Sequence, residues 1–394
     1  MTTDPIVIVS VARTPMGALQ GELKGFAAPE LGAAAIRAAL ERAGVKPEQV
    51  QEVIMGCVLP AGQGQAPARQ ASLGAGLPLS AGCTTVNKMC GSGMKAAMFA
   101  NDLLTAGTND IMVAGGMESM SNAPYLLPKA RSGYRMGHQQ VIDHMFLDGL
   151  EDAYDKGRLM GSFAEDCATK FAFTREEQDR FAITSLERAQ KANQDGSFAW
   201  ETAPIAIKAG KDERFVEHDE QPFKANFDKI PLLKPAFRKD GTVTAANSSS
   251  ISDGAAALLM MRRSMSDKLG LKPLATVVGH STHAQEPGLF TTAPVGAIQK
   301  LFDKTGWTAG KVDLYEINEA FAVVAMAAMR EHKLPHEKVN IHGGACALGH
   351  PIGASGARIL VTLIGALRKN GLKRGVASLC IGGGEATAMA VELI

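Results

Sequence analysis

Cys90 lies in a segment that could present a reactive thiol. The run Asn87–Gly93 reads Asn-Lys-Met-Cys-Gly-Ser-Gly, follows a strand-like run and leads into a helical pattern. A cysteine at the start of a helix faces the positive end of the helix dipole, which lowers the thiol pKa and favours the nucleophilic thiolate. We therefore expect Cys90 to be a covalent nucleophile for acyl transfer. The alternative is a buried structural cysteine, the commoner fate of a lone Cys.

The same segment also matches a nucleotide-binding pattern, because Gly91–Ala96 reads G-x-G-x-x-A. A dinucleotide site requires an acidic residue at the end of the next strand. Asp110 instead precedes the strand Ile111–Ala114, and two glycines follow that strand. The pattern is thus a weak indication of a bound dinucleotide.

The segment His342–Gly353 supplies a candidate base. His342, Cys346 and His350 have the spacing of metal ligands on a helix, but the glycines and the proline of this segment disfavour a helix. A glycine-rich loop that presents His350 to a cleft is the preferred interpretation. His350 would then deprotonate a thiol and donate a hydrogen bond to a developing oxyanion.

Two further segments could complete such a site. Cys380 stands at a strand-to-turn corner before Gly382–Gly384, where consecutive backbone N–H groups could bind an oxyanion. Asn318 opens a helical pattern that continues through Ala322, and its simplest role is a helix cap.

Alternating strand and helix patterns must position these residues. They occupy the first third of the chain and return in the last third, which predicts an α/β fold with a mostly parallel sheet. Between residues 118 and 247 few strands are indicated, and a capping box at Thr174–Glu177 opens a helix to about Ala192. We expect this region to be an inserted, mainly helical loop domain.

The sequence also contains a weak internal repeat. Ser92–Lys95 and Ser355–Arg358 each open a helix that leads to a strand ending in two glycines. A duplicated α/β half is one explanation, and chance similarity of two glycine-rich turns is the other. We predict an N-terminal half over residues 1–117, completed by 248–270, then the inserted domain, then a C-terminal half over 271–394.

Composition narrows the class of protein. The 394 residues carry 41 basic and 40 acidic side chains, which gives no reason to expect nucleic acid or a membrane surface as partner. No apolar run reaches the roughly 18 residues that a membrane span requires. The six cysteines form no C-x-x-C pair, and the first residues show no export or transit pattern. We therefore expect a cytoplasmic protein.

Taken together, these segments resemble the thiolases over essentially the whole chain. The resemblance rests on motifs in the family's order and spacing, namely Ala12–Pro15, Gly62–Gln65, Ala68–Gln70, Asn87–Gly93, Gly115–Gly116, Asn318–Ala322, Gly343–Gly344, Gly349–Pro351 and Cys380–Gly384. It implies a thiolase fold, with two duplicated βαβαβ-type halves and helices around two stacked sheets.

The resemblance also implies a role for each site residue. Cys90 matches the acylated nucleophile, His350 the base that activates it, and Cys380 the acid/base at the substrate α-carbon. Asn318 matches the residue that holds a water, which forms one oxyanion hole together with His350. The backbone N–H groups of Cys90 and Gly382 match the second hole.

Substrate-binding residues follow from the same resemblance. The stretch Val243–Ser250 matches the one that touches the pantetheine arm of coenzyme A, with Ser249 at the family's serine. Apolar channel positions are matched by Phe237, Ala320 and Phe321, although ordinary core is an alternative for them, and for Ala320 the favoured one. Acetoacetyl-specific members of the family carry a motif that resembles His-Met-Gly where this chain has Leu159-Met160-Gly161. The length of the substrate's acyl chain therefore stays open. Phe290 is another pocket candidate.

The implied activity is that of the acetyl-CoA acetyltransferases, to which the chain looks closest. They condense two acetyl-CoA into acetoacetyl-CoA and CoA, and catalyse the reverse thiolysis. The alternatives are a broad-range 3-ketoacyl-CoA thiolase, a decarboxylating ketoacyl synthase and a non-catalytic protein on the same fold. Cys380 argues against the synthase, and the retained site residues argue against the last. The resemblance implies acyl-CoA substrates, no cofactor or metal, and a homodimer or homotetramer.

Overall fold

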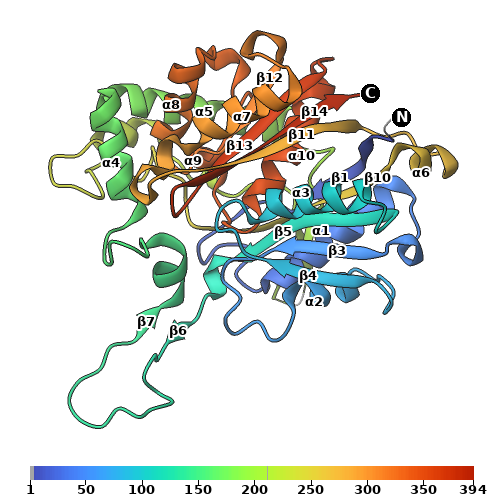
Figure 1. Cartoon of the computed structure of the whole chain (residues 1–394). Coiled ribbons are helices and arrows are strands. Elements are labelled where there is room, and N and C mark those ends of the chain that lie inside the picture. Colours follow the sequence, from blue (N-terminus) through green and yellow to red (C-terminus); the bar gives the residue numbers. More distant parts are fainter. Residues whose placement is uncertain (1–3, 211) are drawn as a thin grey trace.

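Ten strands form one mixed sheet in the computed structural model, which describes residues 4–210 and 212–394 (Figure 1). Their order is β12-β13-β14-β11-β1-β10-β5-β3-β4, and β2 pairs with β10. The strands are β1 (Ile6–Arg13), β2 (Gly17–Ala18), β3 (Glu52–Gly56), β4 (Gly82–Val86), β5 (Ile111–Ser119), β10 (Ser252–Arg262), β11 (Ala275–Ala284), β12 (Leu314–Ile317), β13 (Arg374–Ile381) and β14 (Glu385–Leu393).

The sheet is mixed because returning strands insert antiparallel to their neighbours. β3 is parallel to β4 and β5, and β12 is parallel to β13. The strands β10 and β14 are antiparallel to the strands on both sides of them. The expected mostly parallel sheet is therefore wrong in this detail. β1 and β11 also pair, at Val7–Thr276 and Ile8–Ala275, so the two expected sheets join into one hydrogen-bonded path.

Helices cover the sheet in three layers. The middle layer holds α3 and α10, between the two halves of the sheet (Figure 1), and shares a core with strands of both halves. α1 and α2 pack on the outer face of the N-terminal half, and α7 and α8 on that of the C-terminal half. The helices are α1 (Ala28–Ala43), α2 (Pro67–Gly74), α3 (Ser92–Thr105), α6 (Arg263–Lys268), α7 (Ala293–Thr305), α8 (Ala322–His332), α9 (Ala345–Leu348) and α10 (Ser355–Lys369).

The order of elements repeats between the two halves. The first runs β1, α1, β3, α2, β4, α3, β5, β10, and the second runs β11, α7, β12, α8, α10, β13, β14. A parallel bridge between Tyr315 of β12 and Val339 occupies the place that β4 has beside β3. The repeat anticipated from the starts of α3 and α10 thus extends through the whole order of elements.

Glycines let the first turns of α3 and α10 approach each other closely. A Cβ atom on Gly93 would lie 2.7 Å from the backbone N of Ala357, and one on Gly356 would lie 2.4 Å from the backbone N of Met94. Contacts this short are forbidden for any side chain, and both clashes are with backbone atoms that cannot rotate away. The small second residue of each helix is therefore a packing requirement.

Of residues 118–247, Glu118 and Ser119 still belong to β5. The rest leave the sheet and hold two long helices, α4 (Met160–Phe171) and α5 (Arg175–Gln194). The predicted capping box is present, because Thr174 Oγ1 accepts the Glu177 N–H and the Glu177 carboxylate accepts the Thr174 N–H. The sequence did not indicate the two short hairpins here, β6–β7 (Tyr125–Leu126 and Ile142–Asp143) and β8–β9 (Ile205–Ala209 and Asp212–Val216). The three-part domain division stays a prediction.

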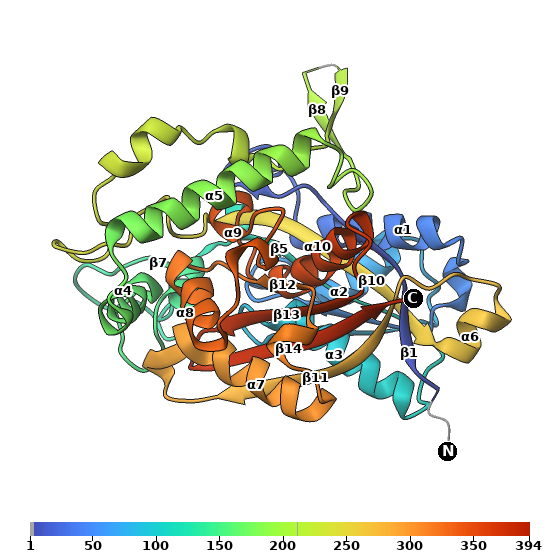
Figure 2. The ribbon, with the colours of Figure 1, turned by 90° about the horizontal axis from the view of Figure 1, so that it is seen from above.

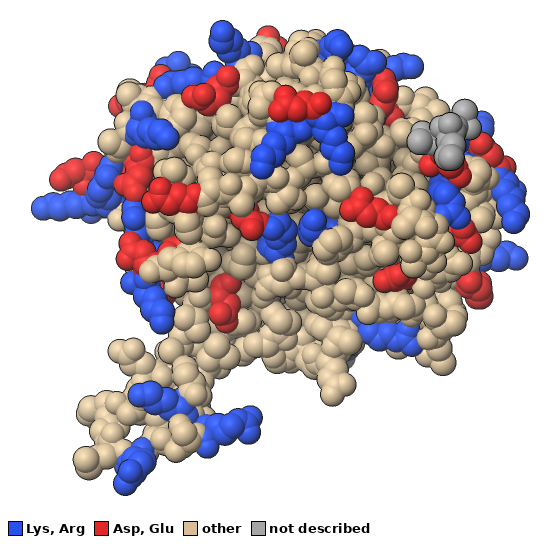
Figure 3. Space-filling model, in the orientation of Figure 1, with Lys and Arg blue, Asp and Glu red and all other residues tan. Residues whose placement is uncertain are grey.

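The segment between β6 and β7 projects from the body of the molecule (Figure 1). In the space-filling view its projecting end carries basic side chains (Figure 3). Seen from above, β8 and β9 form a second projection on the side of α5 (Figure 2). No helix among the described residues is long and apolar enough to cross a membrane.

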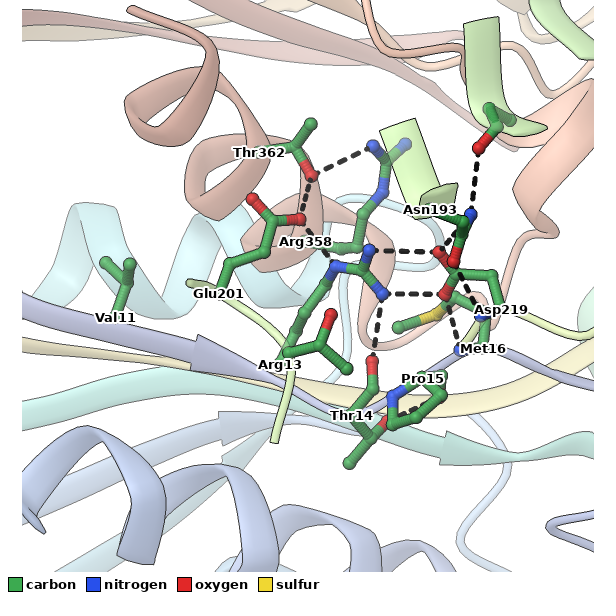
Figure 4. Close-up of polar contacts among 12 residues, drawn as sticks. Val11, Arg13, Thr14, Pro15, Met16, Asn193, Glu201, Asp219, Arg358 and Thr362 are labelled. Carbon is green, nitrogen blue, oxygen red and sulfur yellow. Dashed lines mark hydrogen bonds and ion pairs between the residues drawn. The ribbon is translucent and has the colours of Figure 1, made fainter. Parts of the chain in front are cut away.

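A buried charge network joins β1, the inserted region and α10 (Figure 4). Arg13 is fully buried and donates from Nε to Glu201 at 2.6 Å, and from Nη1 and Nη2 to Asp219 at 2.7 and 3.0 Å. Thr362 of α10 donates to the same Glu201 oxygen at 3.1 Å. Burial opposes the charge of Arg13, but the two carboxylates outweigh it and raise its pKa.

The close contact between α3 and α10 predicts that Gly356→Ala destabilises the protein. The added methyl must push Met94 and α3 away, a kind of overpacking that costs about 1–3 kcal/mol. We expect a lower midpoint of unfolding in urea and a loss of activity larger than the loss of folded protein. The matched control is Gly310→Ala, where a Cβ meets nothing within 4 Å. Equal stability of the two variants would contradict the packing requirement.

Candidate active site

A cavity of about 60 Å³ lies where the two halves meet. Its lining residues come from both halves and from the inserted region, namely Met89, Cys90, Gly149, Leu150, Met160, Ser249, Phe290, Ala320, Phe321, His350, Ile352, Cys380 and Gly382. Nine of the twelve residues that the sequence singled out are among them. Asn318 and Phe237 lie one contact away, and Leu159 lies outside the lining.

The turn before α3 presents Cys90 to this cavity. The Ser92 hydroxyl accepts the N–H of Lys88 at 2.8 Å and donates to the Met89 carbonyl at 2.6 Å, which closes the loop around the cysteine. Met89 has a φ of 47°, in the left-handed region that non-glycine residues rarely adopt. Such strain persists only where the surroundings enforce it, and it commonly marks functional positions.

The Cys90 thiol does not have the lowered pKa expected from its place at a helix start. Burial raises the pKa to about 11, although the backbone N–H groups of Gly382 and of Cys90 itself act in the opposite direction. Loss of hydration therefore outweighs the helix dipole. The free thiol is protonated near neutrality and needs a base to become a nucleophile.

The surroundings of His350 orient its imidazole and keep it neutral. It is 6% exposed, and its Nδ1 lies 2.5 Å from the hydroxyl of Ser355, which itself donates to the Pro351 carbonyl at 2.9 Å. Since the hydroxyl proton is used, Nδ1 must carry the hydrogen and Nε2 keeps its lone pair. Burial, helped by the charge of Arg358, lowers the pKa of His350 to about 3. The imidazole is therefore neutral and able to accept a proton.

Asn318 stands behind His350 at the end of β12. Its Nδ2 lies 3.5 Å from His350 Nε2. Its Oδ1 is buried and has no hydrogen-bond partner among the described residues. A buried amide oxygen without a partner is the kind of atom that an ordered water satisfies. The helix it was expected to cap begins later, at Ala322, so a helix cap does not account for Asn318.

Cys380 and Gly382 come from the end of β13 and the turn after it. Cys380 is 1% exposed, and burial, followed by the neighbouring Cys90, raises its pKa well above the ordinary value. Gly383 and Gly384 have φ values of 90° and 85°, which only glycine adopts without strain, so the β13–β14 turn requires them. This turn brings the Gly382 N–H to Cys90.

Some of the apolar candidate residues line the cavity, and one packs behind its lining. Phe321, Phe290 and Met160 line the cavity directly. Phe237 supports the wall through its ring, whose centroid lies 6.0 Å from that of Phe321 at a near-perpendicular angle. Leu159 only precedes α4 and pairs with Glu151. The residue at the position of the family's histidine therefore does not touch the cavity.

The metal-like spacing of His342, Cys346 and His350 does not form a site. These residues line three different cavities, and Cys346 instead points its thiol toward the Glu319 carbonyl at 3.7 Å. No group of three or more His, Cys, Asp or Glu side chains within residues 4–210 and 212–394 could hold a metal ion. That the reaction needs no cofactor stays a prediction.

A second cavity, of about 330 Å³, opens beside the first. Ser250 lines it, whereas the adjacent Ser249 lines the small cavity, so this short stretch runs between the two. The N–H of Ser249 is held by the Ala320 carbonyl at 2.9 Å. Lys224 and Lys229 supply positive charge to the larger cavity.

Sequence reasoning missed several lining residues. Leu150 and Ile352 are ordinary apolar residues whose position depends on packing, and no motif distinguishes them. Ser355 was seen only as the start of a helix, although its hydroxyl orients His350. The i, i+5 spacing of His350 and Ser355 across a proline could have indicated this contact.

Comparisons with known proteins agree with this geometry. Residues 6–264 match the family "Thiolase, N-terminal domain", and residues 271–393 match "Thiolase, C-terminal domain". The chain is 52% identical to Acetyl-CoA acetyltransferase 2 of Arabidopsis thaliana, covering 99% of this chain and 97% of that protein. It is 48% identical to the acetyl-CoA acetyltransferase of Chromobacterium violaceum, covering 98% of this chain and 99% of that one.

Structural comparison gives the same result. The crystal structure of the Bacillus anthracis acetyl-CoA acetyltransferase superposes with a TM-score of 0.97, at 40% identity over 100% of this chain and 99% of that one. The architecture is thus the α/β thiolase fold. The chain belongs to the thiolase family, and the predicted similarity to acetyl-CoA acetyltransferases is confirmed by about 50% identity over the full length.

The contact between Ser355 and His350 predicts that Ser355→Ala lowers kcat. Without the hydroxyl, the imidazole is free to rotate and to exchange tautomers, so its lone pair no longer faces the cavity. We expect a loss of about ten- to a hundredfold, at the lower end of the ~10²–10⁴ attributed to a general base, with KM for acetyl-CoA nearly unchanged. Ser355→Thr retains the hydroxyl and serves as the control. An unchanged kcat in Ser355→Ala would contradict the orienting role.

Proposed function

We propose that this thiolase is an acetyl-CoA acetyltransferase that works by a ping-pong mechanism. The observation that carries the proposal is the single small cavity lined by Cys90, His350, Cys380 and Gly382. The full-length identity to proteins named acetyl-CoA acetyltransferase supports the substrate.

In the first half-reaction, neutral His350 takes the proton of Cys90 and the sulfur attacks the thioester carbonyl of acetyl-CoA. The negative oxygen of the tetrahedral intermediate receives hydrogen bonds from the N–H groups of Cys90 and Gly382. The carbon–sulfur bond to CoA then breaks, and the Cys380 thiol protonates the departing CoA. This leaves acetylated Cys90, an imidazolium at His350 and a thiolate at Cys380.

In the second half-reaction, the Cys380 thiolate removes a proton from the methyl carbon of another acetyl-CoA. The enolate oxygen accepts hydrogen bonds from protonated His350 and from a water held by Asn318. The enolate carbon attacks the acetyl group on Cys90, forms the carbon–carbon bond and expels the Cys90 sulfur. His350 returns its proton to that sulfur, so every group regains its starting state.

The second cavity is the proposed site of the CoA tail. The pantetheine arm would pass Ser249, Phe321 and Phe237 on its way to the acyl cavity. Lys224 and Lys229 offer positive charge to the phosphates of CoA. This assignment explains why the two serines of one stretch line two different cavities.

Cavity size favours a short acyl chain. At about 60 Å³ the acyl cavity is far smaller than the cavities of about 330 and 520 Å³, which suits an acetyl or acetoacetyl group. One observation favours the broad-range 3-ketoacyl-CoA thiolase as a second candidate. A further cavity of about 520 Å³ shares Met89, Gly149, Met160 and Gly382 with the acyl cavity and could receive a longer chain.

The two cysteine roles predict that Cys90→Ala and Cys380→Ala fail at different steps. Cys380→Ala retains the nucleophile, so mixing with acetyl-CoA should still add one acetyl group to the protein, although slowly. It should show no condensation, because no base removes the α-proton. Cys90→Ala should show neither. Mass spectrometry of the quenched protein and an assay of CoA release make the distinction. No acetyl group on wild-type Cys90 would refute the proposed function.

The small cavity predicts that acetoacetyl-CoA is cleaved faster than a medium-chain 3-ketoacyl-CoA. Thiolysis rates of the two substrates measure this directly, and a preference for the longer chain would establish the second candidate instead. Met160→Ala should shift the ratio toward the longer substrate, because Met160 separates the two cavities. Leu159→Ala is the control, since Leu159 lies outside the lining.

We also propose a cytoplasmic homodimer or homotetramer. All six cysteines are free thiols, which suits a reducing compartment. The projection between β6 and β7 exposes Leu127 (52%), Met136 (91%) and Val141 (59%), an apolar cost that assembly would remove. Light scattering that gives the mass of one chain would refute the assembly.

A further inference from the structure

Glu118 is a buried carboxylate beside the active site to which the reaction described above gives no role. It is the second-last residue of β5 and is fully buried. Its Oε2 accepts the backbone N–H groups of Val58 and Gly353, each at 2.9 Å, and its Oε1 accepts that of Leu59 at 3.1 Å. One side chain therefore takes three backbone hydrogen bonds from two distant segments.

One of the two segments, Val58–Leu59, packs beside the proposed nucleophile Cys90. The other contains Gly353 and follows the proposed base His350. We call them the supports of Cys90 and of His350. Val58 and Leu59 form an apolar cluster with Ile352, and Met89 and Cys90 pack against it. The Val58 carbonyl also accepts the side-chain amide of Asn87, three residues before Cys90, at 3.3 Å. Val58 and Leu59 belong to the half that carries Cys90.

Gly353 belongs to the other half and follows His350 by three residues. The backbone comes so close to Glu118 that a Cβ on Gly353 would lie 2.6 Å from Oε2. The loop from His350 to Gly353 also reaches the start of α10, where Ser355 orients the imidazole. The carboxylate thus connects the cysteine's support to the histidine's support by a path that contains no other side chain.

We propose that Glu118 is a positioning residue for acyl transfer, whose carboxylate sets the separation between Cys90 and His350 by binding N–H groups of both halves. The proposal rests on the roles given above to Cys90 and His350. Glu118 does not touch the reacting atoms. Its action is geometric, because a misplacement of only about 1 Å can cost about a hundredfold in rate.

Only the ionised form can make this connection in full. A carboxylate offers acceptors on both oxygens. A protonated acid or a glutamine keeps one acceptor oxygen, which can still bind the N–H groups of Val58 and Gly353, but it places a donor against the N–H of Leu59. Burial raises the pKa of Glu118 to about 7, although the three N–H groups act in the opposite direction. The titratable groups that face it are the thiols of Cys57, at 3.5 Å, and of Cys90.

The direction of the pH effect follows from this raised pKa. Above pH 7 the carboxylate is ionised and accepts all three N–H groups. Below pH 7 it gains a proton, loses one acceptor and resembles glutamine. Glu118→Gln should therefore differ from the wild type at high pH and approach it at low pH.

The test measures acetylation of Cys90 in single-turnover experiments with acetyl-CoA, followed by mass spectrometry. At pH 8.5 we expect Glu118→Gln to react about ten- to a hundredfold more slowly than the wild type. At pH 6, where only about a tenth of Glu118 stays ionised, the ratio should fall to about two- to tenfold. KM for acetyl-CoA should change little, since the CoA cavity is not involved. Asp313→Asn is the control, because Asp313 accepts the N–H groups of Lys373 and Arg374 at the opposite end of β12 and β13.

The outcomes separate the inference from the function on which it rests. Absence of acetylation in the wild type would refute the proposed function. An acetylated wild type with a Glu118→Gln rate within twofold of it, or slower by the same factor at both pH values, would overturn the positioning role. If Glu118→Gln does not fold, hydrogen exchange on the wild type decides. The Leu59 amide, which faces the oxygen that gains the proton, should lose protection between pH 8.5 and 6 while the β13 amides keep theirs, and equal protection of Leu59 at both pH values would overturn the role.

Discussion

The first turns of α3 and α10 pack directly against each other, and the geometry of the site depends on this contact. Cys90 lies two residues before α3, and His350 lies five residues before α10. Any change in how the two helices meet therefore moves Cys90 relative to His350, the proposed nucleophile and base. Two helix N-termini, each with partial positive charge, also converge on the place where negative oxygen develops during acyl transfer.

Burial has a second effect at this site, because it keeps the reacting groups neutral until substrate arrives. The thiols of Cys90 and Cys380 have raised pKa values and the imidazole of His350 a lowered one, each chiefly through loss of hydration. A preformed thiolate–imidazolium pair would cost free energy in such surroundings. Charge instead appears during reaction, where backbone N–H groups can stabilise it.

Sequence reasoning reached the fold class, the family and most of the cavity lining, for identifiable reasons. Glycine-rich turns such as Cys380–Gly384 leave a clear signature, because only glycine adopts the required backbone angles. The direction of a strand within the sheet left no such signature in the sequence. β10 returns after an excursion of more than a hundred residues, and nothing local shows that it inserts antiparallel between β1 and β5.

The prediction of a lowered pKa for the Cys90 thiol was wrong for a related reason. The helix start is visible in the sequence and predicts a lowered value. The burial that reverses this prediction comes from segments elsewhere in the chain, including Ile352 and Leu150, which line the same cavity. The order of residues along the chain also could not show that Leu159 lies outside the cavity while the adjacent Met160 lines it. Helix phase at the start of α4 decides between them.

The network around Arg13 also bears on how the chain reaches its native state. Arg13 emerges early in synthesis, yet its partners Glu201 and Asp219 follow 188 and 206 residues later, and Thr362 comes near the end. An arginine cannot be buried without its counter-charges, so β1 cannot settle into a closed core while the ribosome is still making the first half. We therefore expect the core around β1 to close only after Glu201 and Asp219 have been made, so that a contact between distant parts of the chain precedes its completion.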